Sequence, residues 1–334
     1  MYADWIDAEI KIVLILQSLG DWLTSPMKFF SFLGSESFYL LVAPVLYWCI
    51  DSALGLRFGV YLSISAGVNS ILKILIHAPR PYWVDRRVIA LSTESSFGIP
   101  SGHSQNAVVV WGSLAASLKK RWATIGAVVL IFLIGLSRIY LGVHFLSDVL
   151  AGWIIGAILL WLLLLLEPKV VPWIRSKTFT RQLTIIFLAS LAFIFFALLS
   201  LKTLGNWSLP QEWIENAAAS APDAKPIDPL AVTGIISNAA ILFGLSVGAL
   251  WLWKREGFNT HGTLWQLLLR YMIGLVGVIL LWYGLDQLFP DSEDLIGYSL
   301  RYIRYALVGL WVSGAAPAIF IKLGLAKSNK SSVP

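Results

Sequence analysis

The sequence predicts an all-α protein, a polytopic bundle of about nine membrane-spanning helices. Hydrophobic residues make up 57% of the 334 residues and charged residues only 13%, a balance that is typical of polytopic membrane proteins and rare in soluble domains. The apolar residues also gather into runs long enough to cross a bilayer, with short polar segments between them. These observations argue against a soluble globular enzyme.

Residues 1–34 mix acidic residues with short apolar runs, which predicts an interfacial amphipathic segment. Acidic residues near the start and the absence of a small-residue cleavage site argue against a signal peptide. The apolar run 10–19 is too short to span a bilayer. We therefore expect this segment to lie at the membrane surface.

The next five apolar runs form a predicted core over residues 35–166. Its spans are expected at 35–50, 56–76, 104–118, 123–142 and 147–166. Residues 77–102 lie between the second and third spans and hold three prolines and several charges. This composition predicts a polar surface loop.

A basic loop at 167–182 separates that core from an additional four-helix membrane region at 183–324, which is followed by a cytoplasmic tail at 325–334. The four spans are expected at 183–203, 230–253, 267–288 and 303–324. The proline-rich stretch 204–229 predicts an exposed loop with a short helix. Nothing after residue 167 resembles a family that we can name. These helices could line a substrate entrance, form an oligomer contact or carry a transport-like activity.

The distribution of basic residues predicts the orientation of the bundle. Counting spans puts four basic segments on one side, at 119–121, 169–181, 254–255 and 322–330. An excess of lysine and arginine marks the cytoplasmic side, so the C-terminus is expected in the cytoplasm. The net charge of +6 then reflects membrane topology, and nucleic acid is not an expected partner. The single cysteine, Cys49, excludes an intrachain disulfide.

Three polar groups stand out where predicted spans begin or end. They are Lys73 with Arg80-Pro81, then Pro100-Ser101-Gly102-His103, then Ser137-Arg138 followed by His144 and Asp148. Exposing such side chains to lipid costs several kcal/mol each, so we expect them to face one polar cavity. The count of spans puts all three groups at extracytoplasmic helix ends. The sequence therefore predicts a site for an anionic substrate.

The third group has the spacing of an oriented nucleophile. His144 and Asp148 are four residues apart at the start of a helix, so they share a face. The carboxylate can accept a hydrogen bond from one imidazole nitrogen and leave the other free to attack. Arg138 closes the preceding helix, and Gly142 allows the turn between them. An imidazole beside a guanidinium suits attack on a phosphoryl group.

The other two groups have the features of a phosphate cradle. Ser101 can cap a helix whose first N–H groups bind an anion, and Gly102 lets the ligand approach closely. His103 lies on the rim, with an intrinsic pKa suited to proton transfer near neutrality. Together with Arg138, Lys73 and Arg80 supply three positive charges, which match a phosphate monoester.

The spacing Lys73-x6-Arg80-Pro81, Pro100-Ser101-Gly102-His103 and Ser137-Arg138-x5-His144-x3-Asp148 resembles the three-part signature of the type 2 phosphatidic acid phosphatase superfamily. The resemblance covers residues 35–166. It implies a metal-independent phosphoric monoester hydrolase without a cofactor. His144 would form a phosphohistidine, Asp148 would orient it, and His103 would protonate the leaving alkoxide and then activate water. The resemblance assigns phosphate binding to Lys73, Arg80, Ser101, Gly102 and Arg138.

The substrate is expected to be a lipid phosphate or lipid pyrophosphate of the phosphatidic acid, sphingoid or polyprenyl type, hydrolysed at the extracytoplasmic face. A soluble sugar phosphate is the alternative, because Arg80-Pro81-Tyr82-Trp83 and the predicted topology resemble glucose-6-phosphatase. A second alternative is a non-catalytic lipid-binding membrane protein. It is disfavoured because such proteins usually lose a catalytic histidine or arginine. The haloperoxidases of the superfamily are soluble, which this chain is not expected to be.

Four residues near the cradle carry weaker signals. Trp83 and Phe97 are possible substrate contacts, although aromatic residues at this depth usually belong to the interfacial belt. Glu94 and Asp85 are expected to be solvated rather than catalytic. Deeper in the membrane, Asn69 is expected to form a hydrogen bond between helices.

Overall fold

The computed structural model describes residues 2–255, 257–290 and 292–329. Within these residues the chain is helical and contains no β-strand, only an isolated bridge between Asn259 and Lys327. The predicted all-α class is confirmed. The last five residues of the predicted tail 325–334 lie outside the described part.

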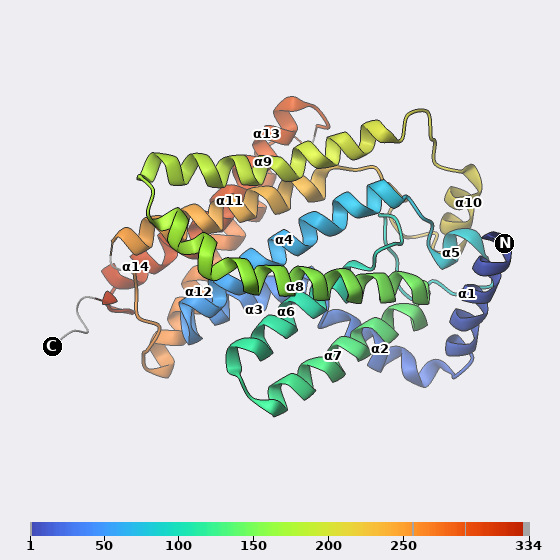
Figure 1. Ribbon diagram of the computed structural model, residues 1–334, viewed down its shortest axis with the longest axis horizontal. Helices are drawn as coiled ribbons and strands as arrows, with labels where there is room; N and C mark the ends of the chain where they lie inside the picture. The colour runs from blue at the N-terminus through green and yellow to red at the C-terminus, as the bar shows by residue number, and fades with distance from the viewer. Residues whose placement is uncertain (1, 256, 291, 330–334) are drawn as a thin grey trace. The chain divides into compact units, whose positions relative to one another are not determined.

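Figure 1 shows the helices along the chain. Their bounds are α1 Tyr2–Gln17, α2 Thr24–Phe32, α3 Glu36–Val45, α4 Ser52–Ile76, α5 Pro81–Val84, α6 Gly102–Leu118, α7 Arg121–Tyr140, α8 Leu146–Arg175, α9 Phe179–Thr203, α10 Gln211–Ser220, α11 Thr233–Lys254, α12 Leu264–Ile279, α13 Leu295–Leu310 and α14 Ala316–Lys322. A 3₁₀ turn covers Asp21–Leu23, and π-helical turns cover Leu46–Ile50, Leu280–Gly284 and Trp311–Ala315. The short helix expected in 204–229 is α10.

Seven helical stretches of the described chain are long and apolar enough to cross a membrane, so the chain is a multi-pass membrane protein. An eighth span requires Asp21–Phe32 and Glu36–Ile50 to act together across a bend of 50°. The predicted count of nine is not confirmed. The span expected at 104–118 is α6, whose 17 residues lie at the lower end of the range of about 17–25 for a crossing helix.

The described residues form two compact units. The first contains residues up to 38, 68–164 and 196–231, and it holds every predicted site residue. In its core, α1 buries Ile10 and Val13 against Val88, Tyr140 and Phe145. Part of the N-terminal segment therefore packs on protein, and its position at the membrane surface stays a prediction.

The second unit contains residues 39–67, 165–195 and those from 232 onward. Here α8 continues through Pro168 and a second proline, so the loop before α9 is much shorter than the predicted 167–182. The residue before a proline is disfavoured in helices. Glu167 is nevertheless held in the helix, because Arg57 donates to both of its carboxylate oxygens at 2.7 Å and the Tyr61 hydroxyl donates at 2.5 Å.

The C-terminal helices of the second unit pack through a glycine and a buried arginine. A side chain at Gly244 on α11 would collide with the carbonyl of Ala306 on α13, so these helices approach closely only because that residue is glycine. Arg270 is fully buried and donates hydrogen bonds to the carbonyl oxygens of Thr260 at 2.6 Å and His261 at 2.8 Å. The guanidinium thus ties α12 to the segment that precedes it.

Candidate active site

The three polar groups of the sequence meet in the first unit, at the ends of four helices. Lys73 lies in the last turn of α4 and Arg138 in the last turn of α7, while Asp148 lies in the first turn of α8. His103 follows the first residue of α6, and His144 lies in the turn between α7 and α8. The side chains are buried except for that of His103, which is half-buried.

His144 is oriented as the four-residue spacing predicts. Its Nδ1 lies 3.1 Å from Asp148 Oδ2, and the same oxygen accepts a hydrogen bond from the Phe145 N–H at 3.0 Å. The other ring nitrogen, Nε2, lies 3.1 Å from Arg80 Nη1. A guanidinium can only donate and a carboxylate can only accept. The proton is therefore on Nδ1, and Nε2 keeps its lone pair.

The surroundings of His144 favour this neutral form. Burial lowers the pKa of its imidazole well below the usual 6.5, and the charges of Arg80, Lys73, Arg138 and His103 lower it further. Desolvation and nearby positive charge both oppose a second positive charge on the ring. The imidazole of His144 is therefore uncharged at neutral pH.

Backbone carbonyl groups hold the two cations of the first group. Arg80 donates to the Ser96 carbonyl from Nε at 2.6 Å, to the Phe97 carbonyl from Nη2 at 3.0 Å and to the Val143 carbonyl from Nη1 at 2.8 Å. Lys73 donates to the Ser96 hydroxyl at 3.2 Å and also to the Phe97 carbonyl. These partners carry no net charge, so they fix both cations without neutralising them.

The second group forms the expected helix start. Ser101 caps α6 by accepting a hydrogen bond from the N–H three residues along at 3.5 Å, and its own N–H donates to the Asp148 carbonyl at 3.0 Å. A Cβ on Gly102 would lie 3.0 Å from Asn69 Oδ1, so glycine leaves room there. Asn69 donates to Gln105 Oε1 at 2.9 Å, and the predicted bond between helices α4 and α6 is confirmed.

Arg138 has an acidic partner that the sequence analysis missed. Its Nη1 donates to the Ser31 hydroxyl at 2.6 Å, and its Nη2 forms an ion pair with Glu94 Oε1. Its Nε has no hydrogen-bond partner among the described residues. The expectation that Glu94 is simply solvated is wrong. Asp85 has a different partner, because its Oδ2 lies 2.6 Å from Nη2 of the exposed Arg87.

The Glu94 carboxylate is ionised. Burial opposes its ionisation, but the positive charges of Arg138, Arg80, His103 and Lys73 outweigh that effect and lower its pKa to about 2. A contact made in the fold holds the main chain of Glu94 in this place. Tyr82, next to the Arg80-Pro81 pair, binds the main chain of Glu94 through its hydroxyl.

Trp83 and Phe97 are fully buried, and the Arg80 guanidinium lies over the Trp83 ring at 5.9 Å from its centre. Trp83 packs against Trp213 of α10 with ring centres 6.1 Å apart, and Phe97 packs against Trp207 at 5.6 Å. Asn216 of α10 donates to the Trp83 carbonyl at 3.0 Å. The 204–231 segment therefore packs on Trp83 and Phe97. Its loop-like composition did not predict this contact.

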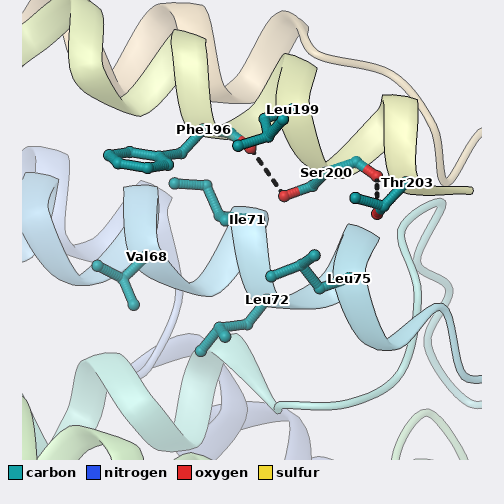
Figure 2. A pocket seen from close by; sticks show the side chains of 8 residues that line it. All are labelled: Val68, Ile71, Leu72, Leu75, Phe196, Leu199, Ser200 and Thr203. Carbon is teal, nitrogen blue, oxygen red and sulfur yellow. Dashed lines mark hydrogen bonds between the residues drawn. The ribbon is translucent and has the colours of Figure 1, made fainter.

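An apolar cavity of about 280 Å³ lies between α4 and α9, and it contains none of the predicted site residues (Figure 2). Its lining residues are Val68, Ile71, Leu72, Leu75, Phe196, Leu199, Ser200 and Thr203. The Ser200 hydroxyl donates to the Phe196 carbonyl at 2.7 Å. This mostly apolar lining offers little to an anion.

The fold and the site together define a class of protein. It is a multi-pass helical membrane protein with a buried cluster of cations and imidazoles. The sequence model described as "PAP2 superfamily" matches residues 54–172, and that of "PAP2 superfamily phosphatase, transmembrane extension" matches residues 236–328. The chain belongs to the PAP2 superfamily. The second match overturns the expectation that nothing after residue 167 resembles a known family.

Several curated and solved proteins are similar to this chain. Phosphatidylglycerophosphatase B of Bacillus subtilis is 33% identical over 162 residues, which are 45% of this chain and 77% of the relative. Glucose-6-phosphatase 3 of Bos taurus is 26% identical over 330 residues, covering 90% and 91% of the two chains. The crystal structure of a transmembrane PAP2-type phosphatidylglycerolphosphate phosphatase from Bacillus subtilis matches at 32% identity and a TM-score of 0.42, covering 49% of this chain and 86% of the other.

Proposed function

We propose that this protein hydrolyses a phosphate ester of a lipid at the extracytoplasmic face of its membrane, through a phosphohistidine intermediate. The observation that carries the proposal is the arrangement around His144. Asp148 binds Nδ1, while Nε2 keeps its lone pair and faces Arg80. A neutral, oriented imidazole beside a guanidinium is suited to phosphoryl transfer.

The proposed reaction has two displacements at phosphorus. In the first, His144 Nε2 forms a bond to phosphorus, the P–O bond to the alcohol breaks, and His103 gives its proton to the departing alkoxide. In the second, His103 takes a proton from water, the hydroxide oxygen bonds to phosphorus, and the P–N bond breaks to release phosphate. Lys73, Arg80, Arg138 and the start of α6 would bind the equatorial oxygens as charge accumulates.

Helix order supports an extracytoplasmic site. The cluster gathers at the end of α7 and the starts of α6 and α8, whereas Lys119, Lys120 and Arg121 join α6 to α7 at the opposite ends. Such a basic connection is typical of cytoplasmic loops. We infer that phosphate is released on the other side and that the C-terminus is cytoplasmic.

A soluble sugar phosphate is the second candidate substrate. Its specific support is the similarity to glucose-6-phosphatase 3, which extends over 90% of this chain. A lipid is favoured by the higher identity to phosphatidylglycerophosphatase B, of which the chain covers 77%. A cluster at helix ends also suits a headgroup whose tails remain in the bilayer.

Phosphate release from phosphatidic acid vesicles and from glucose 6-phosphate tests the proposal directly. We expect wild-type protein to act on phosphatidic acid, and His144→Ala to lose at least about 10³-fold in kcat because no nucleophile remains. The matched control is His261→Ala, since His261 is exposed and belongs to the second unit. Appreciable turnover by His144→Ala would refute the mechanism. Activity on glucose 6-phosphate alone would refute the lipid assignment.

A further inference from the structure

The ion pair between Arg138 and Glu94 is unexpected in a site for an anion. A carboxylate beside phosphate-binding cations repels the ligand that those cations attract. Glu94 nevertheless sits close enough to Arg80, Lys73 and His103 for their charges to act on it. An acidic group held in such a place needs a reason other than phosphate affinity.

Glu94 is built into the site. The Tyr82 hydroxyl donates to the Glu94 carbonyl at 2.9 Å and accepts from the Glu94 N–H at 3.1 Å. Tyr82 itself is 1% exposed, so this pair of bonds anchors the main chain at that point. The Glu94 side chain is 28% exposed, against 2% for its partner Arg138. Its carboxylate therefore lies at the rim, with one oxygen on Arg138.

The rim is where the alcohol part of a substrate must lie. In-line displacement puts the leaving group opposite the nucleophile, and His144 is 1% exposed at the buried end of the site. The leaving group therefore faces His103 and Glu94, the two half-buried members of the cluster. Arg138 can bind the Glu94 carboxylate and the substrate phosphate at the same time, because its Nε has no partner among the described residues.

We propose that Glu94 is a specificity residue, whose carboxylate accepts a hydrogen bond from a donor on the alcohol and repels a second phosphate group. This inference rests on the proposed function and narrows its substrate class. The preferred substrate is a phosphomonoester with a hydroxyl or ammonium group next to the ester carbon. Plain alkyl phosphates lack the donor, and diphosphates place a negative charge against the carboxylate.

Three synthetic substrates with one chain length test the proposal: 2-hydroxydodecyl phosphate, dodecyl phosphate and dodecyl diphosphate. We expect kcat/KM of the wild type to follow that order, with roughly tenfold steps, since a hydrogen bond to a charged group and a like-charge contact are each of that size or larger.

Glu94→Gln keeps the shape of the side chain and removes its charge. It should lower the ratio of hydroxylated to plain phosphate, and raise the ratio of diphosphate to plain phosphate, each about tenfold. Asp85→Asn, in the same loop but paired with the exposed Arg87, should change neither ratio.

An equal loss of kcat/KM on all three substrates would show that Glu94 only holds Arg138, and it would overturn the proposal. Substrate ratios that stay within twofold of wild type would overturn it as well. If Glu94→Gln has no turnover, inorganic pyrophosphate and inorganic phosphate replace the substrates, and thermal shifts give their Kd values. The variant should then favour pyrophosphate about tenfold more than the wild type does, and an unchanged preference would overturn the proposal. A wild type that cleaves none of the three esters would refute the proposed function instead, so the two failures are distinguishable.

Discussion

Replacing Asp148 by Asn tests the central element of the mechanism, the tautomer of His144. The carboxylate oxygen Oδ2 accepts two hydrogen bonds, from His144 Nδ1 at 3.1 Å and from the Phe145 N–H at 3.0 Å. The asparagine amide can turn either way, so its oxygen faces Nδ1 for only part of the time. When the amide N–H₂ faces Nδ1, the imidazole must move its proton to Nε2, and the attacking lone pair is lost.

The size of this effect follows from the bonds that change. A hydrogen bond to a charged group contributes about 1.5–3 kcal/mol, and the wrong tautomer adds to that loss. A total of about 3–5 kcal/mol corresponds to a fall in kcat of roughly 10²- to 10⁴-fold. Phosphate affinity should change much less, because Arg80 and Lys73 are held by hydrogen bonds to Ser96 and Val143.

The assay compares kcat with the Kd of inorganic phosphate for Asp148→Asn and wild type, in the same detergent. Thermal unfolding of both proteins is the control for folding. If Asp148→Asn kept kcat within threefold of wild type, orientation by the carboxylate would play no part in catalysis. If Kd rose as much as kcat fell, the residue would serve binding, and the reasoning from the tautomer would be refuted.

Two further predictions concern pH and sidedness. Burial, followed by Arg80 and Lys73, lowers the pKa of His144 below 6.5, so the unfolded chain takes up a proton there before the folded one does. The contribution of His144 to stability should be fully present above pH 6.5 and fall below it by about 1.4 kcal/mol per pH unit. Thermal unfolding of wild type against His144→Asn between pH 5 and 8 checks this, and an equal pH dependence of the two would contradict it. In a Cys49→Ser background, an impermeant maleimide added to intact cells should label Ser95→Cys, which is exposed near the site, and should not label Lys120→Cys. The reverse pattern would invert the topology.

The sequence was sufficient for the cluster because membrane burial restricts where charge can go. Lys73, Arg138 and Asp148 lie at helix ends in otherwise apolar segments, and polar groups so placed must meet one another or water. Helix α8 was harder, because the pair Glu167-Pro168 normally ends a helix. It continues because Arg57 and Tyr61 bind Glu167, and contacts between residues about a hundred positions apart leave no local trace in the sequence.

Glu94 was missed for a related reason. An acidic residue in a polar loop is usually solvated, and its partner Arg138 lies 44 positions away. What fixes it is the Tyr82 hydroxyl, whose two bonds to the Glu94 main chain depend on the folded path of the loop. Sequence patterns report the residues that chemistry requires at fixed spacing. They do not report which loop residue the fold brings against them.

Neutral groups hold Arg80 and Lys73, whereas a carboxylate holds Arg138. This difference is informative. Carbonyl oxygens and a hydroxyl fix Arg80 and Lys73, so their positions are set before a ligand arrives. Dipoles preorganised in this way stabilise charge that develops in a transition state without further reorganisation. Had phosphate affinity been the only requirement, Arg138 could have been held by neutral groups alone, as Ser31 already does at 2.6 Å. A carboxylate on that guanidinium lowers the affinity for phosphate groups, and for diphosphates most of all. It can help only those substrates that offer it a hydrogen-bond donor. The charge of Glu94 is therefore best understood as selection among phosphate esters.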